Sequence, residues 1–192
     1  MKDVATRATP ERLAFLAERF EDLYRRYNRP EFVDPDPVSL VRGFTDPLDR
    51  EVAGVIASSL AYGRASQIVT SARRVLDKMQ GSPRDFLLGS NDRAIREVCE
   101  GFRHRFTDSR DLSDLLFSVR KALREWGSLE NLFDSGIHCS AEKALGGLAS
   151  LSGALRSSSA GRYNTLLPDL ALGSACKRYH LFLKWMVRRD SI

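Results

Sequence analysis

Apolar residues recur at intervals of three and four along most of this chain, and this spacing limits the fold more than any other feature. The clearest case is segment 111–127, whose apolar side chains fall on one side of a helix: Leu112, Leu115, Leu116, Val119, Leu123 and Trp126. Such a stripe faces a core when the segment is helical. No alternating run is long enough to predict a strand. We therefore expect an all-α protein, a multi-helix bundle of about eight helices.

Start and stop signals set the bounds of these helices. A capping side chain followed by proline begins three of them, at 9–10, 46–47 and 82–83. The expected helices cover 9–28, 46–63, 64–81, 82–89, 91–102, 111–127, 140–159 and 175–189. From Val52 to Tyr62 nearly every residue is apolar or small, so we expect the second helix to be central and buried.

Length and composition narrow the class of protein. We expect residues 1–192 to form a single all-helical domain, with two helical halves around a cleft as the alternative arrangement. No apolar run approaches the roughly 18–20 residues of a membrane span, and the N-terminus lacks the apolar core of a signal peptide. The 3 cysteines form no CxxC pair and the 3 histidines are scattered, so we expect no metal and no cofactor. These features favour a cytoplasmic protein.

Basic residues are concentrated towards the C-terminal end. The formal net charge is +5, from 30 Lys and Arg against 25 Asp and Glu. After position 155, seven basic residues (Arg156, Arg162, Lys177, Arg178, Lys184, Arg188 and Arg189) face only two acidic ones. The excess charge therefore lies entirely in this last part of the chain. Such asymmetry suggests a surface for a polyanion such as nucleic acid.

The basic segment has the pattern of a helix entered through a glycine turn. We expect Ser174 to cap a helix from Ala175 to Arg189, whose core stripe is Ala175, Cys176, Tyr179, Phe182, Leu183 and Met186. Gly173 would let a ligand approach the backbone, and the free N–H groups of the first turn would suit a phosphate. With the closing Leu167-Pro168, residues 166–189 have the outline of a helix-hairpin-helix. A plain glycine-led turn before an amphipathic helix is the alternative.

Two longer stretches resemble a known family. FVDPDPVSLVRGFTDPLDREVAGVIASSLAYGRASQI and LLPDLALGSACKRYHLFLKWMVRRD look like the signature stretches of a bacterial family of unknown function, over a match from Glu11 to Asp190. The second stretch is similar, more remotely, to the helix-hairpin-helix DNA glycosylases. Its closest likeness is to the archaeal branch that removes oxidised guanine. The resemblance implies a bundle of that fold and a DNA partner, damaged or single-stranded.

The glycosylase likeness assigns roles to residues of the last helix. By that resemblance Lys177 falls on the nucleophile of a glycosylase and abasic-site lyase, which attacks the sugar C1′. Gly173, Ser174, Arg178, Lys184 and Arg188 would bind DNA. Related sequences continue into a Pro-Leu-Asp-Thr-His run whose aspartate would match the catalytic carboxylate, and this chain ends at Ile192 without it. We therefore expect a shortened member, incomplete at the C-terminus, in which activity is weak or lost.

A flipped base would need a pocket between helices. Tyr62 is a candidate for stacking on that base, and Arg64 and Gln67 are candidates for polar contacts. The alternative, purely structural interpretation is that Tyr62 belongs to the core and that Arg64 and Gln67 are surface side chains. A second function class also stays open, in which the chain is a non-enzymatic helical interaction module whose basic face docks an acidic protein. Such a module would show no affinity for nucleic acid at moderate salt.

Overall fold

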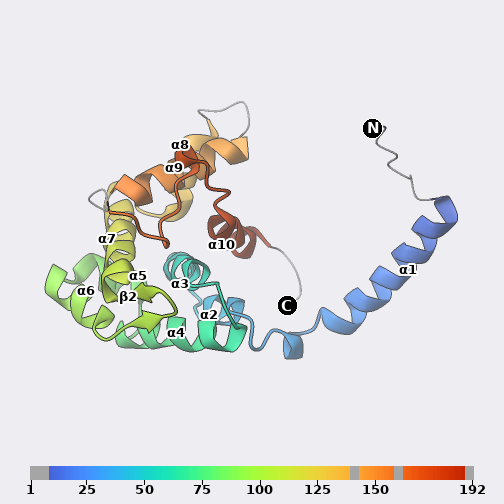
Figure 1. The fold of residues 1–192 in the computed structure, drawn as a ribbon, viewed down its shortest axis with the longest axis horizontal. Helices are drawn as coiled ribbons and strands as arrows, with labels where there is room; N and C mark the ends of the chain where they lie inside the picture. The colour runs from blue at the N-terminus through green and yellow to red at the C-terminus, as the bar shows by residue number, and fades with distance from the viewer. Residues whose placement is uncertain (1–8, 139–142, 158–161, 189–192) are drawn as a thin grey trace. The chain divides into compact units, whose positions relative to one another are not determined.

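The computed structural model describes residues 9–138, 143–157 and 162–188, and these residues are predominantly helical (Figure 1). The α-helices in these ranges are α1 (Pro10–Tyr27), α2 (Val38–Arg42), α3 (Pro47–Ser59), α4 (Ala65–Lys78), α5 (Pro83–Gly89), α6 (Asp92–Cys99), α7 (Ser109–Trp126), α8 (Leu129–Ile137), α9 (Lys143–Ser157) and α10 (Lys177–Val187). Two 3-10 turns, η1 (Pro30–Phe32) and η2 (Leu170–Leu172), complete the helical structure. The all-α class expected from the sequence is confirmed.

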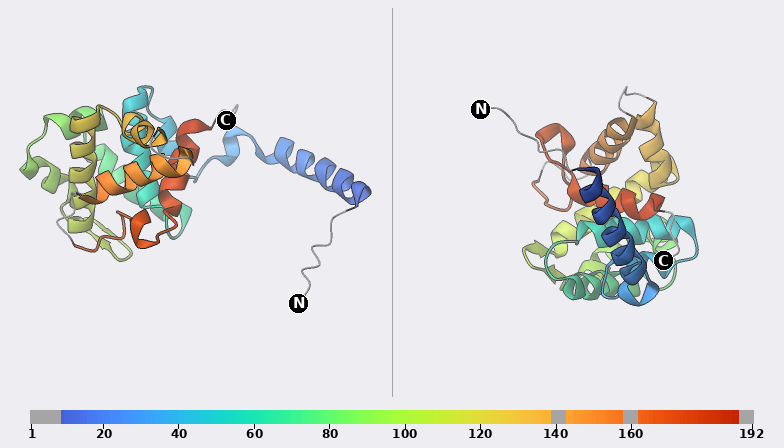
Figure 2. Two further views of the ribbon diagram at one scale, coloured as in Figure 1. Left: turned by 90° about the horizontal axis from the view of Figure 1, so that it is seen from above. Right: turned by 90° about the vertical axis from the view of Figure 1, so that its right-hand side faces the viewer.

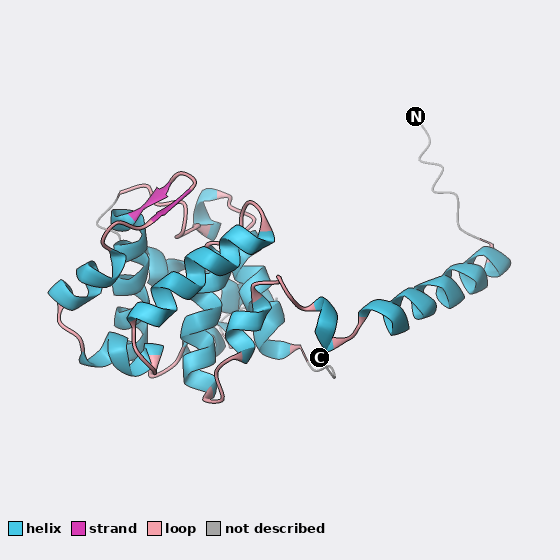
Figure 3. Ribbon diagram, turned by 90° about the horizontal axis from the view of Figure 1, so that it is seen from below, coloured by secondary structure: helices cyan, strands magenta, loops and turns pink. Residues whose placement is uncertain are grey.

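Three elements were not expected. Helices α2 and α8 lie in segments without a predicted helix, and β1 (Arg103–His104) pairs antiparallel with β2 (Thr107–Asp108) in a short hairpin. Figure 3 shows this hairpin as the strand pair of an otherwise helical molecule. Strands of two residues are too short to produce an alternating pattern, so sequence periodicity could not reveal them.

The chain divides into two compact units, each of which we describe by itself. Residues 35–188 form the larger unit and contain the hairpin and all helices from α2 to α10. The other unit contains α1, in which the Thr9 hydroxyl accepts a hydrogen bond from Arg12 N and caps the first turn, as expected. None of the residues of α1 is buried. The single domain expected from the sequence stays a prediction.

Helix α3 lies at the centre of the larger unit, where it packs against α2, α4, α5 and α10. Residues 51–59 of this helix are all buried, which confirms the central helix expected from the apolar run. Figures 1 and 2 show α10 alongside α3. The contact is close because α3 presents Gly54 there: a Cβ on Gly54 would stand 2.9 Å from Met186 Cε and 3.1 Å from Phe182 Cδ2. The second half of α10 is thereby packed against the middle of α3.

Candidate functional site: a cationic aromatic pocket

The turn that enters α10 differs from the expected one. Gly173 adopts a left-handed conformation, with φ 80° and ψ 14°, and Ser174 N donates to Asp169 O over 3.1 Å. The Ser174 hydroxyl accepts from Cys176 N at 3.2 Å, so it stabilises the turn and does not cap the helix. Cys176 is the N-cap and is itself left-handed, with φ 46°. The helix therefore begins at Lys177 instead of Ala175.

The hairpin outline over residues 166–189 is only partly present. Before the Gly173 turn the structure has η2, a 3-10 turn of 3 residues, where a helix-hairpin-helix has a full helix. After the turn, α10 covers 11 residues and ends at Val187. Tyr179, Phe182 and Cys176 are buried as expected from the core stripe, whereas Ala175 is exposed because it precedes the helix. Arg189 lies outside the described residues.

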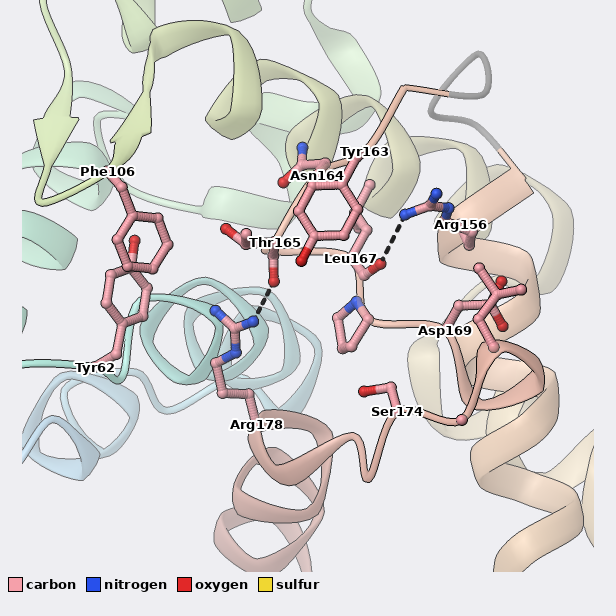
Figure 4. Close-up of a pocket in the computed structure, with 13 residues that line it drawn as sticks. Tyr62, Phe106, Arg156, Tyr163, Asn164, Thr165, Leu167, Asp169, Ser174 and Arg178 are labelled. Atoms are coloured by element: carbon pink, nitrogen blue, oxygen red, sulfur yellow. Dashed lines mark hydrogen bonds between the residues drawn. The ribbon is translucent and has the colours of Figure 1, made fainter.

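Beside this turn lies a pocket of about 500 Å³. Five parts of the chain contribute to it: the α3–α4 connection (Tyr62), the hairpin (Phe106), α9 (Arg156), the segment before α10 (163–174) and α10 itself (Arg178). Figure 4 shows their side chains around the opening. Segments that are far apart in the sequence thus meet beside the Gly173 turn, which the sequence predicted to suit a phosphate.

One wall of the pocket is aromatic. The rings of Tyr62 and Phe106 stack with centroids 4.8 Å apart and planes 14° from parallel. The Tyr62 hydroxyl is hydrogen-bonded to the Thr107 hydroxyl and donates to His104 O at 3.2 Å, which fixes the ring against the hairpin. Burial raises the pKa of Tyr62, so its hydroxyl is neutral and acts as a donor. Phe106 keeps 63% of its surface exposed, and so it offers an apolar face to a ligand.

The other main feature is a half-buried guanidinium. Arg178 Nη1 donates to Ser59 O at 2.9 Å and Nη2 donates to Thr165 O, while the guanidinium carbon lies 5.5 Å from the centroid of the Tyr62 ring. Burial lowers the pKa of Arg178, yet an arginine side chain stays protonated in proteins. No carboxylate of the described residues forms an ion pair with it. The pocket thus contains a positive charge without a counter-ion.

Other charged groups near the pocket have partners of their own. Arg156 Nη1 donates to Leu167 O at 3.3 Å, and the Asp169 carboxylate accepts from Ala171 N at 2.9 Å. Arg162 is neutralised by two carboxylates, with Nη2 2.6 Å from Asp111 Oδ1 and 3.0 Å from Asp114 Oδ2. Arg178 is therefore the cation of this pocket that is best placed to meet an anion.

The expected DNA-binding residues fall in two places. Gly173, Ser174 and Arg178 line the pocket. Lys184 is exposed further along α10, and Arg188 is exposed just after its end; neither lines the pocket. Lys177, the expected nucleophile, is the first residue of α10 and is also exposed. It does not line the pocket, although Ser174 and Arg178 on either side of it do.

The three candidates for base contacts do not come together. Tyr62 lines the pocket, but Gln67 lines a separate hollow with Arg103 and Arg105. Arg64 is exposed and precedes α4 as its N-cap residue. Arg156 was counted among the basic residues of the last part of the chain but not assigned to a site, and Phe106 and Tyr163 were not expected at the site at all. Only Phe106 carries a local signal, an aromatic residue among the basic residues of RHRF.

Among the described residues there is no group of three or more His, Cys, Asp or Glu side chains that could hold a metal ion. In the same ranges, no helix is long and apolar enough to cross a membrane.

The structure is that of a helical protein with a cationic, aromatic pocket near the start of its last described helix. The family model of DUF2400, described as a protein of unknown function, matches residues 36–192, so the chain belongs to that family. The membership confirms the uncharacterised family expected from the sequence. No curated protein and no solved structure matches the chain.

Proposed function

We propose that the chain binds DNA and holds one unstacked nucleotide in the cationic aromatic pocket. The observation that carries this proposal is Arg178, a half-buried cation that, among the described residues, donates hydrogen bonds to the carbonyl oxygens of Ser59 and Thr165 and to no carboxylate. A buried charge is costly unless an opposite charge compensates it. A phosphate at the pocket would provide that compensation, and guanidinium groups bind phosphate well.

The aromatic wall favours a nucleotide over a simple anion. Phe106 stacks on Tyr62 with one face and is otherwise largely exposed. Tyr163, which also lines the pocket, is 76% exposed. A base stacked on such a ring gains about 1–3 kcal/mol, whatever its identity. The pocket therefore suits a base that has left its stack, as in single-stranded DNA or at a damaged pair.

The test is binding of a fluorescent single-stranded oligonucleotide, followed by anisotropy at several salt concentrations. We expect binding at low salt that weakens as salt rises, because phosphate contacts release counter-ions. Replacing Phe106 by alanine should weaken binding about 5- to 150-fold, the equivalent of about 1–3 kcal/mol of stacking. Trp126→Ala removes an aromatic residue that is 41% exposed outside the pocket lining, and should leave the affinity unchanged.

Two results would contradict the proposal. Wild-type protein without measurable affinity for DNA at low salt would favour the protein-interaction module instead. Equal affinities of wild type and Phe106→Ala would show that DNA binds elsewhere on the surface.

Lyase chemistry at Lys177 is a second candidate, connected with the proposed likeness to helix-hairpin-helix DNA glycosylases. It is favoured by the exposed ε-amine of Lys177 at the first position of α10, between two residues that line the pocket. In this reaction the neutral amine would attack the sugar C1′, and the base would leave with the electron pair of the glycosidic bond. The two amine protons would pass to the departing base and to the ring oxygen, which opens the sugar and gives a Schiff base; at an abasic site, where no base remains, the C1′ oxygen leaves as water instead.

Borohydride tests this candidate directly, because it reduces the Schiff base to a stable amine. Wild-type protein with abasic DNA should give a covalent adduct, and Lys177→Ala should give none. Lys184→Ala, a matched loss of an exposed lysine on the same helix, should still form the adduct. DNA binding without any adduct would exclude the lyase and leave the binding proposal intact.

A further inference from the structure

A second cationic surface begins at the edge of the aromatic pocket. At the tip of the hairpin, Phe106 lines the pocket, and its neighbour Arg105 is exposed with a left-handed φ of 54°. The Arg105 side chain lies over the backbone at Gly63. A Cβ on Gly63 would stand 3.2 Å from Cδ and 3.2 Å from Nη1 of Arg105. Arg178 and Arg105 therefore both lie near Tyr62, and the charge of each lowers the pKa of its hydroxyl. The cationic character of the pocket continues onto the hairpin.

A buried histidine attaches this hairpin to α4. His104 is 4% exposed; its Nδ1 lies 2.9 Å from Ser71 Oγ and its Nε2 lies 3.0 Å from Tyr62 O. Arg103 and Arg105 flank this anchored residue and are both exposed. The hairpin thus holds two arginines in fixed backbone positions next to α4.

The outer face of α4 extends the same surface. Its inner face buries Ile68, Val69, Ala72, Val75 and Leu76, and so Arg73 and Arg74 are exposed. A hollow of about 490 Å³ is lined by Arg103 and Arg105, and a hollow of about 630 Å³ is lined by Arg73 and Arg74. Thr70 lines both hollows, so they are neighbours. We name Arg73, Arg74, Arg103 and Arg105 the basic strip.

The basic strip differs from Arg93 and Arg120 in its lack of ion pairs. Arg93 and Arg120 lie 2.8 Å and 2.5 Å from the carboxylates of Glu97 and Asp92. No arginine of the strip has such a partner among the residues that the structure describes. Asp77 lines the same hollow as Arg73 and Arg74 without pairing with either. Four arginines without an ion pair to a described residue, lining two neighbouring hollows, suit a chain of negative charges.

We propose that the basic strip binds the phosphate backbone of the DNA strand whose unstacked nucleotide occupies the aromatic pocket. The inference rests on the proposed function and adds the path of the strand, from the pocket past Arg105 and Arg103 to the outer face of α4. Strand binders of this kind combine an aromatic platform with a cationic groove that follows the backbone. The charge count of the sequence could not show the strip, because the chain before position 156 is formally neutral.

The experiment compares salt dependence in matched variants. The strip variant carries Arg73→Ala and Arg74→Ala, and the control variant carries Arg93→Ala and Arg110→Ala, whose hollow also contains Glu97 and Glu100. Binding of an oligothymidylate of about 16 nucleotides is measured by anisotropy over a range of salt concentrations. Each lost phosphate contact lowers the slope of log affinity against log salt by about 0.7 for a single strand. We expect the strip variant to lose about 1.4 of the slope and the control variant to lose none.

The outcomes separate this inference from the proposed function. If wild type binds and Phe106→Ala binds more weakly, but the strip variant keeps the wild-type slope, the path along α4 is wrong and the pocket proposal stands. Absence of oligonucleotide binding by wild type would overturn both. A second pair of substitutions, Arg103→Ala with Arg105→Ala, should reduce the slope in the same way, since all four side chains are exposed and their loss leaves the core intact.

Discussion

Arg178 Nη1 on α10 donates a hydrogen bond of 2.9 Å to the carbonyl oxygen of Ser59, the last residue of α3. The same guanidinium reaches Thr165 O in the segment before α10. One side chain therefore joins the end of the central helix, the segment before α10 at the pocket and the last described helix. Arg178 thus has a structural role besides the ligand-binding role that we propose for it, and the two can be separated by measurement.

We expect Arg178→Ala to lower the free energy of unfolding by about 1–3 kcal/mol, because hydrogen bonds from a charged donor are lost and two carbonyl oxygens are left without it. Loss of an uncompensated buried charge offsets part of this effect. The check is urea unfolding followed by circular dichroism, with Lys184→Ala as an exposed control on the same helix. A stability equal to that of wild type would show that the hydrogen bonds of Arg178 contribute nothing net.

Close packing of α8 against α9 leads to a second prediction, on two glycines. A Cβ on Gly136 would stand 2.2 Å from Gly146 O and 2.4 Å from Ser150 Oγ, whereas a Cβ on Gly153 would meet nothing within 4 Å. We expect Gly136→Ala to destabilise by about 1–3 kcal/mol or more through overpacking. Gly153→Ala, in the exposed interior of α9, should stabilise by about 0.5–1 kcal/mol.

Both glycine variants can be compared by their urea midpoints. If Gly136→Ala were as stable as wild type, the two helices would have to be further apart than they are in the structure. From the sequence, the glycines of α9 indicate only a weaker helix. The structure gives Gly147 a packing reason, because a Cβ there would stand 2.6 Å from Phe133 Cζ on α8, a helix that was not expected.

The helices were largely predictable because their signals are local. A cap, a proline in the first turn and an apolar stripe all lie within one segment, as in α3, where Asp46 Oδ1 accepts from Leu48 N at 2.7 Å. The start of α10 was misplaced for a related reason. Ser174 is a good capping residue, but its hydroxyl bonds to Cys176 N within the turn, and the left-handed backbone of Cys176 has no signature in the sequence.

The pocket was predictable where it borders α10 and at Tyr62, the candidate for base stacking. Gly173, Ser174 and Arg178 follow one another closely, so a single motif could select them. Phe106 and Arg156 join them through the tertiary fold, and a single sequence contains nothing that links position 62 to position 106. Lys177 and Arg178 are neighbours in the sequence, but adjacent helical residues point in different directions. The sequence motif therefore could not show that Arg178 lines the pocket and Lys177 does not.

The last prediction concerns Glu51, a buried carboxylate on α3 that caps α8. Its oxygens accept from Leu129 N at 2.7 Å and from Glu130 N at 3.0 Å, and it is 6% exposed. Burial raises its pKa above the ordinary value of 4.5, although these two hydrogen bonds oppose the rise. Since the folded state then holds the proton more tightly than the unfolded state, the stability contributed by this group is complete below pH 4.5 and is lost as pH rises through the raised pKa.

Glu51→Gln cannot ionise, so it should lack this pH-dependent loss. The variant keeps one acceptor oxygen and loses one hydrogen bond to the start of α8, which should destabilise it by about 1 kcal/mol at low pH. As pH rises above 4.5, we expect the stability gap between wild type and variant to become smaller. Urea unfolding between pH 4 and pH 7 measures the gap, and Glu125→Gln on the exposed face of α7 serves as control. A gap that grows with pH would mean that the folded state favours the charged carboxylate, and that the N–H groups of α8 outweigh burial.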